Sequence, residues 1–333
     1  MTAARTVAQE ALAFWITGPG RGALRAEPLP APGTGQALVR ALYSGISRGT
    51  EGLVFRGEVP ESEYSRMRAP LQDGAFPFPV KYGYASVGQV EAGPAPLIGR
   101  EVFCLHPHQD RYLAPLELLL PLPEQVPARR AVLGANMETA LNALWDGAPC
   151  LGDRIAVIGA GVVGCLVARL AAAIPGTEVY LIDTDPAKAG LAAALDLPFL
   201  TPDAAGDRLA DVCDLVVHAT GSPEGLAPCL TLAGFEATIL ELSWYGTKPV
   251  SLPLGQDFHA KRLKLISSQV GSLSPARRAR RSHSDRLAMA LTLLRNPLFD
   301  SLLDGEVAFA ELPDTMARLA AGEAALCRVV RYD

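Results

Sequence analysis

The chain has few of the residues from which metal sites and disulfide frameworks are usually built. Its 333 residues include five histidines and six cysteines, and the cysteines are scattered, with no Cys-x-x-Cys pair. This spacing predicts neither a disulfide framework nor a cysteine-rich zinc lobe, because both need cysteines at short, regular intervals. We therefore expect most of the cysteines to be small buried hydrophobic side chains.

Long apolar runs and an excess of positive charge are also lacking. No apolar run approaches the roughly 18 residues that a membrane span requires, and the N-terminal residues 1–15 show no charged-then-apolar signal pattern. The formal net charge of −5 gives no general attraction to nucleic acid or to anionic membranes. We therefore expect a cytoplasmic protein whose partner is a small-molecule substrate, with no nucleic acid and no membrane.

The composition that is present indicates a globular protein of two domains. Apolar residues make up 49% of the chain and charged residues 20%, which is typical of an α/β enzyme. Residues 1–130 contain short β-like runs between Pro- and Gly-rich turns, and predict a β-rich domain. Residues 131–299 alternate strands and helices, whereas residues 300–333 read as strand, helix and strand and are expected to complete the first domain.

The alternating segment predicts a parallel sheet built from βαβ units. The expected strands cover residues 154–159, 178–183, 214–220, 236–242 and 263–268.

A glycine-rich turn in this segment predicts a dinucleotide site. The sequence "GAGVVG" (Gly159–Gly164) has the G-x-G-x-x-G spacing, follows an apolar strand and opens a helix. Gly159 permits a tight turn, Gly161 lets a pyrophosphate approach the backbone, and Gly164 lets the helix pack closely on the strand. Val162 and Val163 complete the cofactor-binding turn. A Rossmann-like domain that has lost its nucleotide is the alternative.

An acidic residue at the end of the next strand favours NAD over NADP. Asp183 follows Gly164 at the expected distance, and no Arg or Lys comes directly after it. Its carboxylate would accept hydrogen bonds from the ribose hydroxyls and repel a 2′-phosphate. Thr220 and Gly221 end a later strand, where the nicotinamide ribose would lie; the same segment can equally be a strand-to-helix turn with Ser222 as N-cap.

The order of a β-rich module, a dinucleotide domain and a C-terminal return resembles the medium-chain dehydrogenase/reductase superfamily over nearly the whole chain. Its zinc enzymes carry P-x-x-x-G-H-E-x-x-G-x-V-x-x-x-G, and "PVKYGYASVGQVEAG" (79–93) keeps the proline and the three glycines. The resemblance implies an α/β fold with a Rossmann domain and a GroES-like catalytic domain. "SGISRGTE" (44–51) with "GYASVG" (83–88) looks most like the branch of bacteriochlorophyllide dehydrogenases, which oxidise a hydroxyethyl side chain on a tetrapyrrole.

The sequence departs from this family at the zinc ligands. Tyr84 stands where the zinc enzymes have His, Ala85 where they have Glu, and Ser47 where they have the first Cys. The third ligand position corresponds to Glu138. Serine and tyrosine hydroxyls are poor zinc ligands at neutral pH, so we predict no metal and a substrate oxygen polarised by hydrogen bonds or a positive charge.

Several side chains are candidates for that role. The resemblance places Tyr84, Ser47, Thr50 and Glu51 on the wall that faces the nicotinamide; Tyr84 either donates to a carbonyl oxygen or only packs there. Glu51 is expected to form a structural ion pair with Arg48 rather than to act as a catalytic acid.

Two histidines in "HPHQDRY" give a further candidate. On a strand, His106 and His108 would face one side. His106 is the preferred second catalytic residue, as an acid or base, and a metal site formed by both histidines with Glu138 is an alternative. Glu138 is otherwise either a charged group under the nicotinamide or a helix N-terminal acid.

The sequence as a whole predicts a zinc-independent, NAD-dependent oxidoreductase. It would transfer a hydride between nicotinamide and a secondary alcohol or ketone on a bulky substrate. If that substrate is anionic, the basic run Arg277–Arg281 could bind it. The other interpretation of this run is a solvated loop. A quinone or enone reductase and a non-catalytic redox sensor are the alternative functions. Relatives commonly pair their dinucleotide domains, so a homodimer is expected.

Overall fold

The computed structural model describes residues 9–333, which form two compact units. Unit 1 comprises residues 9–135 and 303–333, and unit 2 comprises residues 136–302. These boundaries lie within a few residues of the 130 and 300 that the sequence pattern indicates. Residues 1–8 lie outside the described residues. They begin the segment in which we expected no signal pattern.

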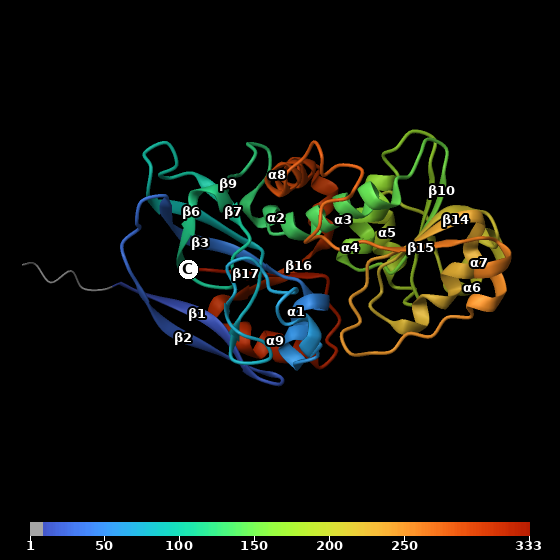
Figure 1. Ribbon diagram of the computed structural model, residues 1–333. Coiled ribbons are helices and arrows are strands. Elements are labelled where there is room, and N and C mark those ends of the chain that lie inside the picture. Colours follow the sequence, from blue (N-terminus) through green and yellow to red (C-terminus); the bar gives the residue numbers. More distant parts are fainter. Residues whose placement is uncertain (1–8) are drawn as a thin grey trace, which may run out of the picture. The chain divides into compact units, whose positions relative to one another are not determined.

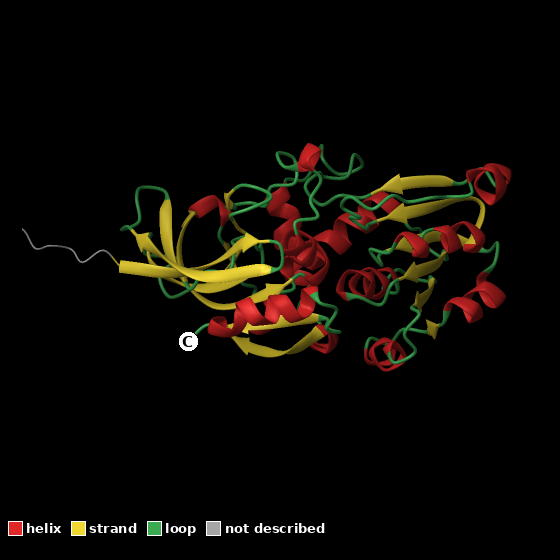
Figure 2. Cartoon of the chain, turned by 90° about the horizontal axis from the view of Figure 1, so that it is seen from below, coloured by secondary structure: helices red, strands yellow, loops and turns green. Residues whose placement is uncertain are grey.

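Unit 1 consists mainly of β-sheet (Figures 1 and 2). One sheet has the strand order β2-β1-β5-β4, and the other has the order β16-β17-β3-β6-β7-β9, with β8 also paired to β3. Its strands are β1 (Gln9–Gly18), β2 (Arg21–Leu29), β3 (Gln36–Ile46), β4 (Asp73–Gly74), β5 (Val80–Lys81), β6 (Ser86–Ala92), β7 (Glu101–Cys104), β8 (Arg111–Pro115), β9 (Leu120–Pro121), β16 (Leu303–Ala308) and β17 (Cys327–Arg331).

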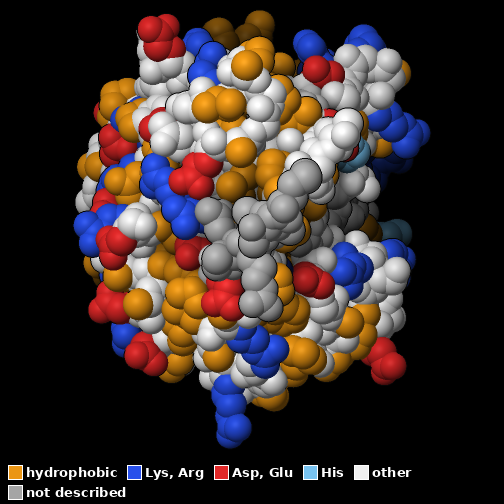
Figure 3. Space-filling view, turned by 90° about the vertical axis from the view of Figure 1, so that its left-hand side faces the viewer, with side chains coloured by type: hydrophobic (Ala, Val, Ile, Leu, Met, Phe, Trp, Pro, Cys, Tyr) orange, Lys and Arg blue, Asp and Glu red, His pale blue; other side chains and the backbone are white. Residues whose placement is uncertain are grey.

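The helices of unit 1 are short and cover the sheets. They are α1 (Arg48–Arg56), α2 (Ala128–Ala131) and α9 (Leu312–Ala320). Helix α9 packs against α1 and β2 (Figure 1). On the face of unit 1 that Figure 3 shows, acidic and basic side chains are interspersed with apolar ones.

Strand β3 organises the interior of unit 1. It pairs with β6 on one side and with β17 on the other, both antiparallel. Val39 and Ala41 are buried on it, as are Val87 and Val90 on β6, so apolar side chains from neighbouring strands form the core. The C-terminal strand therefore lies beside the end of β3, directly before α1.

Unit 2 is a doubly wound α/β domain. Its parallel sheet has the order β12-β11-β10-β13-β14-β15. The strands are β10 (Arg154–Ile158), β11 (Glu178–Ile182), β12 (Phe199–Leu200), β13 (Cys213–His218), β14 (Ala233–Glu241) and β15 (Lys264–Ser267). Helix α3 (Gly134–Gly147) begins at the boundary of the units, and the other helices are α4 (Val162–Ala171), α5 (Lys188–Ala194), α6 (Pro202–Leu209), α7 (Ala227–Leu232) and α8 (His283–Leu293).

The sheet of unit 2 is buried because helices pack against it. Ile155, Ala156 and Val157 of β10 are all fully buried, as expected for a central parallel strand. Helix α4 packs on β10 and β11, whereas α7 packs on β13 and β14. The chain winds in opposite directions from β10, so the carboxyl ends of β10 and β13 form the switch point at which such sheets bind ligands.

Two further observations concern the described residues. No helix within residues 9–333 has the length and apolar character to cross a membrane. All six cysteines are free, and all except Cys150 are buried.

Candidate functional site

The glycine-rich turn lies between β10 and α4, at the carboxyl edge of the parallel sheet of unit 2. Gly159 has a φ of +112°, a conformation that L side chains rarely adopt. A Cβ on Gly164 would lie 1.9 Å from the Gly159 carbonyl oxygen, whereas a Cβ on Gly161 would meet nothing within 4 Å. Gly164 therefore allows the close packing of α4, and Gly161 leaves open space over the helix N-terminus.

The helix that follows offers free backbone donors. Helix α4 begins at Val162, followed by Val163, and its N-cap residue Gly161 has no side chain that could occupy the first N–H groups. An open helix N-terminus of this kind favours a phosphate. The turn therefore fits the pyrophosphate of a dinucleotide.

Asp183 stands at the end of β11, beside this turn. One carboxylate oxygen accepts a hydrogen bond from the Ala160 amide at 2.7 Å, and the other accepts one from the Asp185 amide at 3.0 Å. Each oxygen retains a second lone pair. Asp183 therefore supports the turn and can still accept a hydroxyl donor.

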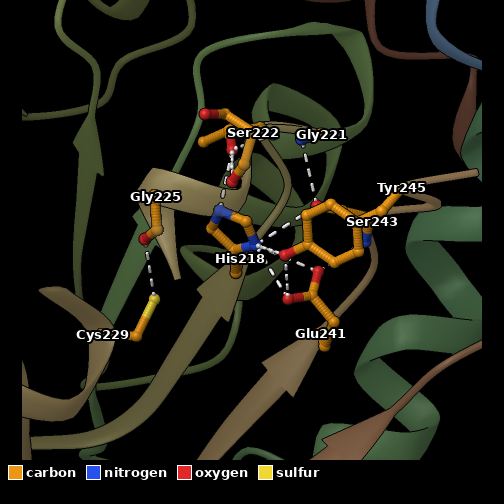
Figure 4. A network of polar contacts seen from close by, with 9 residues as sticks. His218, Gly221, Ser222, Gly225, Cys229, Glu241, Ser243 and Tyr245 are labelled. Carbon is orange, nitrogen blue, oxygen red and sulfur yellow. Dashed lines mark hydrogen bonds and ion pairs between the residues drawn. The ribbon is translucent and has the colours of Figure 1, made fainter. Parts of the chain in front are cut away.

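On the other side of β10, the ends of β13 and β14 carry a network of polar contacts (Figure 4). Nδ1 of His218 lies 2.9 Å from the Glu241 carboxylate, and Nε2 lies 2.7 Å from the Thr220 hydroxyl. Tyr245 donates its hydroxyl to the same carboxylate at 2.7 Å. A cavity of about 480 Å³ adjoins the network and is lined by Thr220, Gly221, Ser222, Pro223, Glu224, Lys248 and Pro249.

In unit 1, the hydroxyls of Ser47 and Tyr84, which stand at two of the predicted zinc-ligand positions, meet that of Thr50. The side chains of Ser47 and Thr50 hydrogen-bond to Tyr84. Burial raises the pKa of Tyr84 far above its usual value, the nearby charge of Glu51 raises it further, and the two hydrogen bonds lower it only in part. Tyr84 is therefore a neutral phenol at any ordinary pH.

Behind these hydroxyls lies a buried carboxylate–imidazole pair. Glu51 is 2% exposed and His108 is 1% exposed, and the two meet at 2.8 Å through Nε2. Glu51 also accepts the Ser47 amide at 2.8 Å. Nδ1 of His108 lies 2.7 Å from the Ser44 hydroxyl, which in turn lies 2.9 Å from the Tyr332 hydroxyl.

This pair corrects the expected partner of Glu51. Within the described chain the carboxylate pairs with His108, not with Arg48, because α1 turns Glu51 inward and β3 and the 105–109 segment bring the imidazole to it. Gly83 permits the approach: a Cβ there would lie 2.8 Å from Cδ2 of His108, and its φ is +127°. The glycine before Tyr84 thus makes room for His108.

His106 has different surroundings from His108, because residues 105–107 are not in a strand. Its ring stacks on Tyr112 at 3.7 Å between centroids, and Nδ1 donates to the Pro107 carbonyl at 2.8 Å. Burial lowers the pKa of His106 to about 3. These contacts favour a packing role over the acid–base role that the sequence suggested.

Glu138 is engaged inside unit 2. It lies on α3 and accepts a hydrogen bond from Nε of Arg286 on α8 at 3.0 Å, and Arg286 is 1% exposed. Arg286 also donates to Asn142 and to two carbonyls of the loop before α8. These contacts favour a structural ion pair between Glu138 and Arg286.

The basic run Arg277–Arg281 lies in an exposed turn before α8.

No group of three or more His, Cys, Asp or Glu side chains within residues 9–333 is placed to hold a metal ion. The donors at the zinc positions are a serine, a tyrosine whose raised pKa keeps the phenol protonated, and Glu138, whose carboxylate is paired with Arg286. Zinc prefers thiolate, imidazole and carboxylate, so these residues do not fit it.

The sequence did not reveal the partners of the histidines. Glu241 lies near the end of a predicted strand and Tyr245 follows it, but nothing in their spacing links them to His218. Tyr332 lies 288 residues from Ser44, and only the pairing of β17 with β3 brings them together.

Two curated relatives are similar in sequence. L-galactonate-5-dehydrogenase of Escherichia coli is 26% identical over 278 residues, which cover 72% of this chain and 78% of that protein. (R,R)-butanediol dehydrogenase of Bacillus subtilis is 27% identical over 138 residues, which are 38% of this chain and only 39% of that relative's length. No family model matches the sequence.

Solved structures match over almost the whole chain. A protein of Escherichia coli described as a short chain alcohol dehydrogenase, solved with NADH, has a TM-score of 0.77 at 16% identity, with 97% of this chain and 99% of that one covered. A Sinorhizobium meliloti protein described as a zinc-binding dehydrogenase, solved with NADP, has a TM-score of 0.78 at 18% identity, with the same coverage. The chain therefore has the α/β fold of these dehydrogenases, with a Rossmann domain and a GroES-like domain.

Proposed function

We propose that this chain is an oxidoreductase that uses NAD(H) to transfer a hydride between the nicotinamide and a secondary alcohol or ketone, without zinc. The observation that carries the proposal is the neutral phenol of Tyr84, hydrogen-bonded to Ser47 and Thr50 in place of metal ligands, in a chain that also has an open dinucleotide turn. The dehydrogenases that match in sequence and in structure support the reaction class.

The turn and Asp183 support the choice of cofactor. NAD would place its pyrophosphate over Gly161 and its adenosine ribose near Asp183, and when bound it would supply the hydride acceptor or donor. The Asp183 carboxylate accepts hydroxyl donors and repels a 2′-phosphate. The neighbours were solved with NADH and with NADP, so the preference for NAD rests on Asp183.

Tyr84 would polarise the substrate oxygen. A neutral phenol that donates to a carbonyl oxygen stabilises the negative charge that develops there as hydride arrives. Because the pKa of Tyr84 is raised, the phenol keeps its proton until the substrate oxygen becomes an alkoxide. The phenol proton then passes to that oxygen. In the oxidation direction the Tyr84 phenol would first have to lose its proton to solvent, a step that its raised pKa disfavours, before its oxygen could take the proton of the alcohol. Ser47 and Thr50 orient the phenol.

Replacing this hydroxyl tests the proposal. Tyr84→Phe removes the donor, and we expect kcat to fall by about 10² to 10⁴-fold, the usual range for a general acid or base. NADH affinity should not change, because the cofactor turn lies in unit 2. Tyr43→Phe, which removes a phenol hydroxyl on β3, is the control and should keep full activity. Unchanged turnover in Tyr84→Phe removes Tyr84 from the mechanism.

Two finer points belong to the same proposal. We infer a bulky substrate, such as a hydroxyethyl group on a tetrapyrrole, from the resemblance of residues 44–51 and 83–88 to the bacteriochlorophyllide dehydrogenase branch. We also infer a cytoplasmic homodimer. Its support is that β15 is the last strand in the sheet order of unit 2 and carries the exposed side chain of Leu265, so a second copy could continue the sheet.

A further inference from the structure

The segment between β15 and α8 presents four exposed arginines in a single short turn: Arg277, Arg278, Arg280 and Arg281. We call residues 275–281 the basic turn. The Arg281 amide donates to the Arg277 carbonyl at 3.1 Å, which is the bonding pattern of an α-helical turn. Because a helical residue advances the chain by about 1.5 Å, the arginines extend over only about 6 Å.

The basic turn is fixed at both ends. Ser274, which precedes it, is 2% exposed and donates its hydroxyl to the Trp145 carbonyl of α3 at 3.1 Å. Ser282, which follows it, caps α8: its hydroxyl accepts the Asp285 amide at 3.1 Å, and its amide donates to the Asp285 carboxylate at 2.9 Å. The arginines are therefore presented by backbone of defined geometry.

Helical spacing brings the like charges of the basic turn together. Residues three or four apart are neighbours on such a turn, so Arg277 lies beside Arg280 and Arg281. Arg278 and Arg281 are neighbours for the same reason. Like charges at these spacings destabilise the turn, and no ion pair within residues 9–333 involves any of the four side chains.

Most guanidinium donors of the basic turn are open to an anion. Arg280 donates one guanidinium nitrogen to the Ala276 carbonyl at 3.0 Å. Each guanidinium is a planar fork that binds phosphate or carboxylate oxygens through two parallel hydrogen bonds. Because the run is shorter than the Debye length of about 8 Å at physiological ionic strength, the four charges act together on a bound anion.

The basic turn is separate from the predicted dinucleotide turn. The dinucleotide turn follows β10, whereas the basic turn follows β15, and β13 and β14 lie between these two strands in the sheet. Three strand spacings place β15 about 14 Å from β10. Ser274 also holds the basic turn against α3, whereas the glycine-rich turn opens α4. Unit 2 therefore has a second positive site of its own.

The size of the basic turn favours a small ligand. Each phosphate or carboxylate can pair with one or two guanidinium forks, so four forks suit about two to four anionic groups. A protein that binds duplex DNA contacts about 6 to 10 phosphates along it. The formal net charge of the chain is −5, which repels an extended polyanion outside the turn.

We propose that the basic turn is a binding site for a small soluble polyanion that carries two or more phosphate or carboxylate groups. Oligophosphates and tricarboxylates belong to this class, because charge and paired hydrogen bonds recognise them in the same way. The inference does not depend on the proposed function, since none of the four arginines belongs to the glycine-rich turn or to the hydroxyl cluster at Tyr84.

Calorimetry with inorganic tripolyphosphate at low ionic strength tests the site. The test variant removes every charge of the turn: Arg277→Gln, Arg278→Gln, Arg280→Gln and Arg281→Gln. It should bind tripolyphosphate about 80-fold more weakly than the wild type, about threefold for each of four exposed ion pairs. The control variant removes four exposed arginines elsewhere and should bind as the wild type does: Arg21→Gln, Arg25→Gln, Arg66→Gln and Arg100→Gln.

The stability of the test variant separates binding from structure. Its urea midpoint should equal or exceed that of the wild type, because the substitutions remove repulsion between neighbouring like charges. A midpoint below that of the control variant would make the arginines structural and overturn the proposal. Wild-type protein that does not bind tripolyphosphate, or an equal loss of binding in both variants, would overturn it as well.

Two further ligands identify the source of the anion and the place where it binds. Tripolyphosphate should stay bound when NADH is added; displacement by NADH would place it at the dinucleotide turn and overturn the proposal. Vesicles of phosphatidylserine and phosphatidylcholine at about 1:4 should bind no better than neutral ones. Vesicle binding that the test variant loses, without binding of tripolyphosphate, would assign the turn to a membrane. If NADH does not bind, the proposed function fails, but the comparison of the two variants still decides this inference.

Discussion

Acid should destabilise unit 1 through His106, and the size of the effect can be worked out. The imidazole is 6% exposed, and burial lowers its pKa to about 3, with smaller contributions from Lys81 and His108. An unfolded histidine has a pKa near 6.5. Between about pH 6.5 and about pH 3 the unfolded chain therefore binds a proton at His106 that the folded chain does not.

The sign follows from proton linkage. Because the unfolded state binds more protons in this window, the free energy of unfolding falls as the pH falls, by about 1.4 kcal/mol per pH unit from this one group. The stabilisation is complete above about pH 6.5, and about 2 kcal/mol of it is lost by about pH 5. His106→Phe keeps a ring on Tyr112 but cannot be protonated, so the variant should lack this part of the pH dependence.

Urea unfolding at several pH values measures the effect. Trp15 lies in unit 1, whereas Trp145 and Trp244 lie in unit 2, so Trp145→Phe with Trp244→Phe leaves fluorescence that reports unit 1. The free energy of unfolding changes by about 2 kcal/mol per M urea. Between about pH 6.5 and about pH 5, the urea midpoint of the protein that retains His106 should therefore fall by about 1 M more than the midpoint of His106→Phe.

The exposed His259 provides the control. His259→Gln should keep the full pH dependence of the wild type. Equal pH dependence in His106→Phe and the wild type would refute the reasoning, because His106 would then be protonated as easily in the folded chain as in the unfolded one.

Two further predictions concern packing at the candidate site residues. Gly83→Ala should destabilise unit 1 by about 2 kcal/mol or more, because its Cβ would collide with His108 and its φ is left-handed; urea unfolding followed by Trp15 measures it, and an unchanged midpoint would contradict the close approach. Glu138→Ala should destabilise unit 2 by about 3 kcal/mol, because it leaves the buried charge of Arg286 without its carboxylate; unchanged stability with lost turnover would instead indicate a catalytic Glu138.

The dinucleotide half of the fold could be predicted because its information is local. The apolar strand before Gly159, the glycine spacing and the acid at Asp183 all lie within one βαβ unit. The structure has β10, the turn and α4 where the pattern places them. Parallel strands joined by helices leave few alternative topologies, so the sequence pattern was sufficient there.

The polar networks could not be predicted, because they join residues far apart in the sequence. Glu51 and His108 are 57 residues apart, and His218 and Glu241 are 23 apart. The choice between Arg48 and His108 as the partner of Glu51 depends on which face of α1 is buried. In the structure Glu51 is buried together with the four residues that follow it, Gly52 to Phe55. Strand pairing, rather than spacing, brings these groups together.

The central claim is that the protein transfers a hydride without zinc. The most direct test measures hydride transfer from NADH to a ketone by protein that lacks stoichiometric zinc. Protein treated with a chelator, with its zinc content measured, is incubated with NADH deuterated at C4 and a panel of ketones that includes acetoin, acetophenone and an acetyl-bearing chlorin. The account predicts deuterium at the carbinol carbon of at least one product, at a rate that added zinc does not raise. Protein that transfers no deuterium, or does so only after zinc is restored, would contradict it.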